Sequence, residues 1–123
     1  MDRLKLQYSL ICQKDERSGF KNIIHGFTAG RAPNFYVVNK WVWDTNDELI
    51  DGFFQVTELI RDGEIVSSSQ SDLFMIKLAH THHNLFAGIS FTKEGNYRIR
   101  VNLFDQQGSL IEEGSLEYPL FIA

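Results

Sequence analysis

The sequence predicts an all-β protein, and more specifically a two-layer antiparallel β-sandwich. Short apolar stretches recur along the chain, with turn residues between them every ~8–12 residues, which is typical of antiparallel strands. Within most stretches, apolar and polar residues alternate with a period of two, as in a strand that buries one face. No stretch carries the periodicity of a long helix. The pattern therefore predicts eight or nine short strands.

In chain order, alternation over residues 4–12 predicts a first strand, whose apolar face would hold Leu4, Leu6, Tyr8, Leu10 and Cys12. Further strands are predicted at residues 20–27, 35–43, 52–60 and 64–68. Asp62 and Gly63 form a strong signal for a type I′ hairpin turn between the last two strands. Residues 71–80 fit either a short helix capped by Ser71 or a buried strand, and the neighbouring strands favour the strand.

Residues 91–122 predict a closing β-hairpin. One face of its first strand holds four apolar residues, namely Tyr97, Ile99, Val101 and Leu103. Arg98 and Arg100 lie between them, and a slip of one residue would bury both arginines, so the register is strongly specified. Gly108 supplies the turn. The return strand presents Leu116, Tyr118, Leu120 and Ile122 on one face. Pro119 has no N–H, which predicts that this strand lies at an edge or ends there.

Composition predicts one domain, residues 1–123, with enough apolar side chains for a core of its own, since 43% of the residues are hydrophobic and 13% aromatic. The net charge of −4 and the absence of a basic run argue against nucleic-acid binding. No apolar run approaches the ~20 residues of a membrane span, and no signal-peptide core is present. Cys12 is the one cysteine, which favours a reducing cytoplasm, and its position predicts an inert core thiol.

Gly95, one intervening residue and Tyr97 open an alternating strand. This arrangement resembles the penultimate strand of immunoglobulin-like sandwiches, in which the tyrosine hydroxyl bonds back to the preceding corner. Trp41 would suit the core tryptophan of that fold, so an immunoglobulin-like Greek key is expected. Three segments together, LQYSLIC, GFKNIIHGF and FTKEGNYRIRVNLFDQQG, resemble a family of uncharacterised bacterial β-sandwich domains. The resemblance implies the fold and a bacterial origin, and it implies no activity.

His80, His82 and His83 form the one cluster of metal-ligand type. On a strand, His80 and His82 would point to the same face, as metal ligands do. Cupin-like barrels follow such a pair with a carboxylate, whereas residues 84–87 contain none. We therefore expect no metal and no cofactor, and a metal-dependent enzyme at these histidines is the weakest of three functional hypotheses. The chain also lacks a Gly-x-Ser-x-Gly elbow and a glycine-rich phosphate loop.

Residues 35–43 and 73–78 are apolar on both faces. A two-layer sandwich buries one face of each sheet, so the second face of these segments needs a cover. Either the chain's own loops cover it, or a second copy does, and we expect a homo-oligomer, most simply a two-fold dimer. The contact is expected near Trp41 or Trp43 and Phe74 or Ile76.

The sequence thus favours a non-enzymatic protein that acts through protein–protein interaction or self-association. The alternative is a carbohydrate or small-ligand module that uses Trp41 and Trp43 as an aromatic platform. Taken together, the candidate ligand or interface residues are Phe35, Trp41, Trp43, Phe74 and Ile76.

Overall fold

The computed structural model describes residues 4–15, 19–43, 52–76 and 79–123. This part of the chain consists of strands and their connections, which confirms the all-β prediction. It has no helix that is long and apolar enough to cross a membrane. Residues 71–80, which fitted either a short helix or one buried strand, contain no helix among their described members. Only Phe74–Met75 and the first residues of a later strand, from Ala79, are strand, so the single buried strand is replaced by two short pieces; residues 77–78 lie outside the described part.

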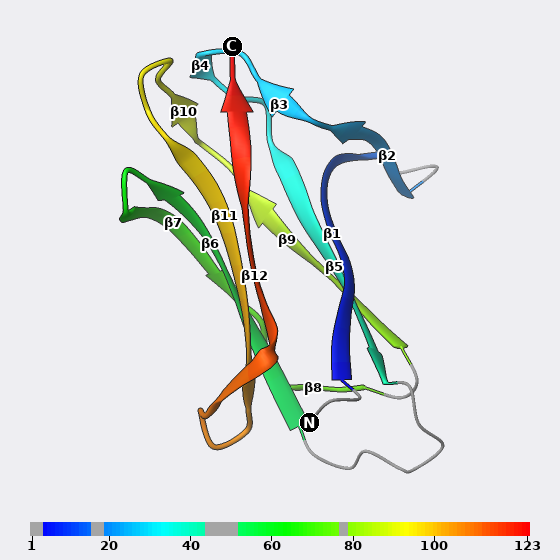
Figure 1. The fold of residues 1–123 in the computed structure, drawn as a ribbon. Helices are drawn as coiled ribbons and strands as arrows, with labels where there is room; N and C mark the ends of the chain where they lie inside the picture. The colour runs from blue at the N-terminus through cyan, green and yellow to red at the C-terminus, as the bar shows by residue number, and fades with distance from the viewer. Residues whose placement is uncertain (1–3, 16–18, 44–51, 77–78) are drawn as a thin grey trace.

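Figure 1 shows two sheets that face each other, an arrangement consistent with a β-sandwich. One sheet contains β1 (Leu4–Asp15), β2 (Gly19–Ile24), β5 (Phe35–Trp43) and β9 (Ala79–Phe86). The other contains β3 (Gly26–Phe27), β6 (Gly52–Arg61), β7 (Glu64–Gln70), β8 (Phe74–Met75), β11 (Tyr97–Asp105) and β12 (Leu110–Ile122). The strand order is β2-β1-β5-β9 in the first sheet and β3-β12-β11-β6-β7 in the second, where β8 also pairs with β6. A small third sheet joins β4 (Gly30–Arg31) to β10 (Ser90–Phe91).

The core lies between the two main sheets, which both contribute to one cluster of buried side chains. The four apolar residues predicted for the inner face of β11 are at most 1% exposed, namely Tyr97, Ile99, Val101 and Leu103. Arg98 and Arg100 lie on the outer face, where their Nε atoms are 2.6 Å from Glu117 and 3.0 Å from Glu58. The predicted register of the closing hairpin is therefore confirmed.

This register predicts unequal costs for truncating neighbours on β11. Val101→Ala should lower the free energy of unfolding by about 2 kcal/mol, because it leaves a cavity in a fully buried site. Arg98→Ala should cost less than about 1 kcal/mol, because its ion pair with Glu117 is solvent-exposed. Urea denaturation of both variants measures the difference. A larger loss for Arg98→Ala would contradict the register.

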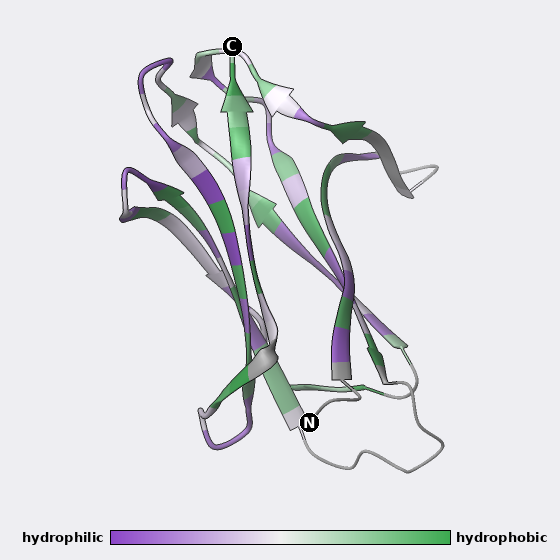
Figure 2. Cartoon of the chain, viewed as in Figure 1, coloured by the Kyte–Doolittle hydropathy of each residue, from purple (hydrophilic) through white to green (hydrophobic). Residues whose placement is uncertain are grey.

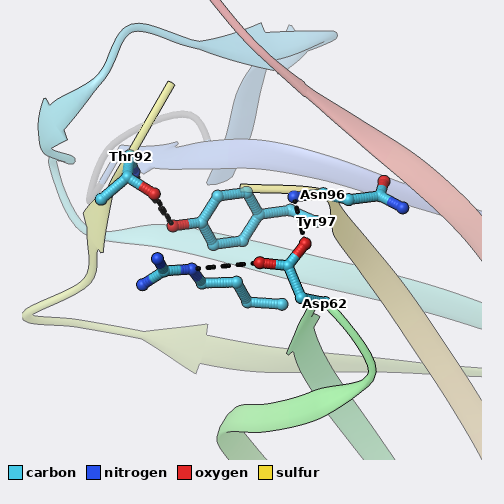
Figure 3. Close-up of polar contacts among 5 residues, drawn as sticks. Asp62, Thr92, Asn96 and Tyr97 are labelled. Carbon is cyan, nitrogen blue, oxygen red and sulfur yellow. Dashed lines mark hydrogen bonds and ion pairs between the residues drawn. The ribbon is translucent and has the colours of Figure 1, made fainter. Parts of the chain in front are cut away.

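Tyr97 ties the start of β11 to the preceding corner, as the sequence predicted (Figure 3). The Thr92 backbone N–H donates to the Tyr97 hydroxyl at 3.0 Å, and the Thr92 hydroxyl lies 3.3 Å away. A Cβ on Gly95 would lie 2.5 Å from Cε2 of the Tyr97 ring, so a glycine is needed at this approach. The Gly95-x-Tyr97 pattern therefore reflects packing between these two residues.

The same corner is joined to the turn between β6 and β7. Asp62 and Gly63 have φ values of 50° and 84°, and a type I′ turn requires positive φ at both central positions. The Asp62 carboxylate accepts from the Asn96 backbone N–H at 3.0 Å, and the Asp62 N–H donates back to the Asn96 carbonyl at 2.9 Å (Figure 3). The turn thus serves both to reverse the chain and to hold the neighbouring hairpin.

The prediction that β1 keeps one apolar face is wrong, because a β-bulge interrupts it between Leu6 and Tyr8. Before the bulge, Leu6 pairs with Trp41 on the inner face; after it, Ile11 takes the inner face opposite Val37. An inserted residue turns every later side chain to the opposite side. Tyr8 and Leu10 therefore point outward with Lys40 and Val38 as partners. Cys12 is buried as predicted, and burial raises the pKa of its thiol.

The predicted second strand is two strands that belong to different sheets. Its first part, β2, pairs with β1, whereas β3 runs parallel to β12 and places Gly26 opposite Phe121. The chain changes sheets at His25, between the two strands. β12 is neither an edge strand nor ended by Pro119, since it lies between β3 and β11 and runs to Ile122. The partner β3 pairs only with Phe121 and Ile122, so within the described residues Pro119 has a ladder partner on one side, Arg98, and needs no N–H toward the other.

Candidate functional site

Most of the described apolar side chains of the two-sided strand β5 are covered within the chain. Phe35 and Trp41 point into the core and are 0% exposed. On the outer side Val38 is 4% exposed. The Lys14 ammonium lies 5.6 Å from the centroid of the Tyr36 ring, and the His83 ring meets that ring edge-on with 5.8 Å between the centroids. The expectation that Phe35 and Trp41 contact a ligand or a second copy is therefore corrected, because neither has surface to offer. The Trp43 side chain lies outside the described part of the structure.

Trp41 instead belongs to a buried polar network that joins the two sheets. We call this network the polar seam, and its members are Asn39, Trp41, Gln55, Thr57, Ser71 and Asn84. Gln55 lies at its centre: its side-chain oxygen accepts from Trp41 Nε1 at 2.9 Å and from Asn39 Nδ2 at 3.3 Å. The Gln55 amide then donates to Asn84 Oδ1 at 3.1 Å.

The polar seam fixes how the sheets lie on each other, because Asn39, Trp41 and Asn84 belong to one sheet and Gln55 to the other. Buried polar groups in such networks are costly to separate. The polar seam was not predicted from the sequence. Its signal was a polar residue at inward positions of otherwise apolar strands, namely Asn39 in β5 and Gln55 in β6.

The histidines predicted to share a face do so. His80 pairs with Trp41 and His82 with Asn39, which puts both on the inner face, whereas His83 pairs with Val38 on the outer face. The Phe74 ring stacks on His80 at 4.1 Å with an interplanar angle of 6°, and it lies 5.7 Å from the His82 ring. Among the residues that the structure describes, no group of three His, Cys, Asp or Glu side chains could hold a metal ion.

Burial lowers the pKa of His80 and of His82. For His82, the neighbouring His80 and His83 lower the pKa further, while Asp72 opposes the shift. The buried Nε2 atom of His80 has no hydrogen-bond partner within the described ranges. Both inner histidines are thus held in their neutral form at neutral pH, and they act here as flat packing surfaces for Phe74.

The outer face of the six-stranded sheet carries an apolar row at one end. Phe53 and its partner Phe74 both point inward, so Phe54, Leu73 and Met75, which adjoin them in the chain, point outward. Further along the row, Phe54 pairs with Phe104, and Phe104 pairs with Leu110. We call these residues the outer apolar row: Phe54, Leu73, Met75, Phe104 and Leu110. Figure 2 shows the corresponding hydrophobic colouring on β8 and on the first residues of β6 and β12.

The outer apolar row is exposed at its flanks and packed at its centre. Leu73, Met75 and Leu110 are 62%, 48% and 48% exposed. Between them the Phe54 and Phe104 rings stack at 5.2 Å with an interplanar angle of 14°. Toward the other end of the same face, the side chains are charged and paired, as in the Arg98–Glu117 and Arg100–Glu58 ion pairs. The row is therefore an apolar patch with a polar boundary.

This geometry changes the residues expected at a contact. Ile76 is 1% exposed and belongs to the core, and Phe74 packs inward against it. Ile76 has no surface to offer, so its assignment to the contact is corrected, whereas Phe74 is partly buried and its place at a contact stays a prediction. The segment 73–76 nevertheless has the two apolar sides that the sequence predicted, and its outward side chains are Leu73 and Met75.

No protein-family model and no curated protein matches the sequence.

Proposed function

We propose that this protein is a non-enzymatic β-sandwich domain of the immunoglobulin-like Greek-key type that acts through protein–protein contact, most simply as a two-fold homodimer. The outer apolar row carries the proposal, because a contiguous apolar patch on a small protein marks an interaction surface. A cytoplasmic setting belongs to the same proposal, and the buried free thiol of Cys12 supports it.

Three observations support the immunoglobulin-like topology. The chain crosses between the main sheets after β2, after β3, after β5, after β8 and after β9, so hairpins within one sheet alternate with crossings to the other, as in a Greek key. In strand order, β1-β5-β9 corresponds to strands A-B-E of that fold, and β12-β11-β6-β7 corresponds to strands G-F-C-C′. The bond from the Thr92 N–H to the Tyr97 hydroxyl matches the tyrosine tie of the same fold.

The arrangement of the outer apolar row suits a second copy of the chain. A two-fold axis parallel to the strands, passing between Phe54 and Phe104, would place each of these rings over the other ring of the second copy. The same axis would bring Leu73 toward Leu110, so apolar side chains would meet apolar side chains throughout. Interfaces obtain most of their binding energy from such a central aromatic pair with flanking contacts that exclude water.

The size of the row sets the expected strength. Five such side chains cover on the order of a few hundred Å², whereas a stable interface buries about 800 Å² on each partner. We therefore expect a reversible dimer whose population depends on protein concentration.

Leu110→Lys should shift this protein to a monomer, because it places a charge inside the apolar contact of the dimer. The fold of the monomer should tolerate the lysine, since Leu110 is half-exposed there. Light scattering at about 100 μM protein measures the change, with 14.2 kDa as the mass of one chain. Leu85→Lys is the matched control, since Leu85 is 49% exposed on β9 of the other sheet and Leu110 is 48% exposed. A wild-type monomer at this concentration, or dissociation by Leu85→Lys alone, would contradict the proposed surface.

A further inference from the structure

The short strand β8 connects the outer apolar row to the inner histidines. Its outward residue Met75 and the preceding Leu73 belong to the row, and its inward residue Phe74 stacks on His80. We propose that protonation of His80 and His82 releases β8 and so disassembles the outer apolar row, which makes the interaction surface sensitive to acid. The effect on assembly rests on the proposed function, whereas the release of β8 does not.

The attachment of β8 is small. It pairs with β6 at two positions, where Gly52 meets Met75 and Phe53 meets Phe74. On its inner side, the Phe74 ring lies 4.1 Å from His80 and 5.7 Å from His82 in near-parallel stacks. Much of the inner contact of β8 is thus made with two titratable rings, and Ile76 supplies a core contact just beyond it.

The surroundings disfavour a positive charge on either ring. The His80 and His82 rings lie 5.8 Å apart, and His83 lies 6.3 Å from His82 on the far side, so protonated rings would repel one another. The buried Nε2 of His80 has no hydrogen-bond partner within the described residues, so a proton placed there would remain unsatisfied. Asp72 is the carboxylate that acts on His82, and it offsets part of the repulsion from its exposed position.

The sign of the effect follows from the histidines' preference for the neutral form. Burial holds the pKa of both rings below the ordinary value of about 6.5, and release of β8 returns them toward that value. The released state therefore binds protons more readily than the docked state. The docked arrangement is fully favoured above about pH 6.5 and loses stability as the pH falls through the lowered pKa values.

Hydrogen exchange of the intact chain tests the release directly. We expect the backbone amides of residues 73–76 to lose at least about tenfold in protection between about pH 7.5 and about pH 5.5, after correction for intrinsic exchange rates. Amides of β11 should keep their protection over the same range, which separates local release from global unfolding. Light scattering at the same two pH values then reports assembly.

Three variants assign the effect. His80→Phe keeps a ring under Phe74 without a titratable nitrogen, and His82→Gln removes the second proton site; each should reduce the loss of protection. His25→Gln is the control, because His25 is exposed and lies outside the cluster. If His80→Phe does not fold, His82→Gln decides the question alone.

The outcomes separate this inference from the function on which it draws. Unchanged protection of residues 73–76 in acid, or an equal effect of His25→Gln, would overturn the release of β8. Release of β8 in a protein that is monomeric at every pH would uphold the release and overturn the proposed dimer. A dimer that persists in acid while β8 is released would overturn the coupling between the two.

Discussion

Gln55→Ala is expected to lower the free energy of unfolding by about 4 kcal/mol, which is the largest loss anticipated from a single truncation in this protein. The Gln55 side chain is fully buried and bonds to Trp41, Asn39 and Asn84. Its removal would leave the Trp41 N–H and the Asn84 side-chain oxygen without these partners, and each buried unsatisfied group costs about 1–3 kcal/mol. The cavity left behind adds to the loss.

Two comparisons separate the hydrogen bonds from the change in volume. Gln55→Leu restores most of the lost volume without any polar atom, so it should remain several kcal/mol less stable than the wild type. Gln70→Ala on the neighbouring strand β7 removes the same side chain from an exposed position and should cost less than about 0.5 kcal/mol. Urea denaturation provides all three values. A Gln55→Leu variant as stable as the wild type would show that the polar seam contributes no net stability.

The features that were predictable from the sequence are those that depend on neighbouring residues in the chain. Strand β5 has the predicted bounds, and the inner face of β11 has the predicted members, because alternation of apolar and polar side chains is a local property. The turn at Asp62 and Gly63 was likewise set by the conformations those two residues tolerate.

The features that were not predictable depend on which strands meet. The bulge in β1 is defined by its register against β5 and has no signature in residues 4–12 themselves. Both faces of β5 are apolar, so its own residues do not show which face is inward, whereas the hydrogen bond from Trp41 to Gln55 of the opposite sheet places the indole between the two sheets. The two apolar sides of residues 73–76 were evident in the sequence. Their outer neighbours Phe54 and Phe104 could be recognised only once the strand register was known.

Gly114→Val is expected to lower the free energy of unfolding by about 3 kcal/mol through overpacking. Gly114 is buried on β12, where the register against β11 is irregular between Val101 and Leu103. A Cβ built there would lie 2.8 Å from Cβ of Leu103 and 3.1 Å from Cζ3 of Trp41. The first of these contacts involves the stem of Leu103, which cannot move away by rotation, so the backbone of β11 or β12 would have to shift.

The sign of this effect distinguishes packing from backbone preference. Gly114 does not have a positive φ, so an ordinary residue fits its backbone, and valine favours strands by up to about 1 kcal/mol. Without the close contacts, the substitution should therefore stabilise the protein. Ser115→Val is the matched control, since Ser115 is the next residue of β12 and is exposed; it should change stability by less than about 0.5 kcal/mol. Thermal and urea denaturation of both variants measure the difference. A gain in stability from Gly114→Val would mean that Trp41 and Leu103 do not pack against this glycine. That result would also contradict the placement of Trp41 in the core.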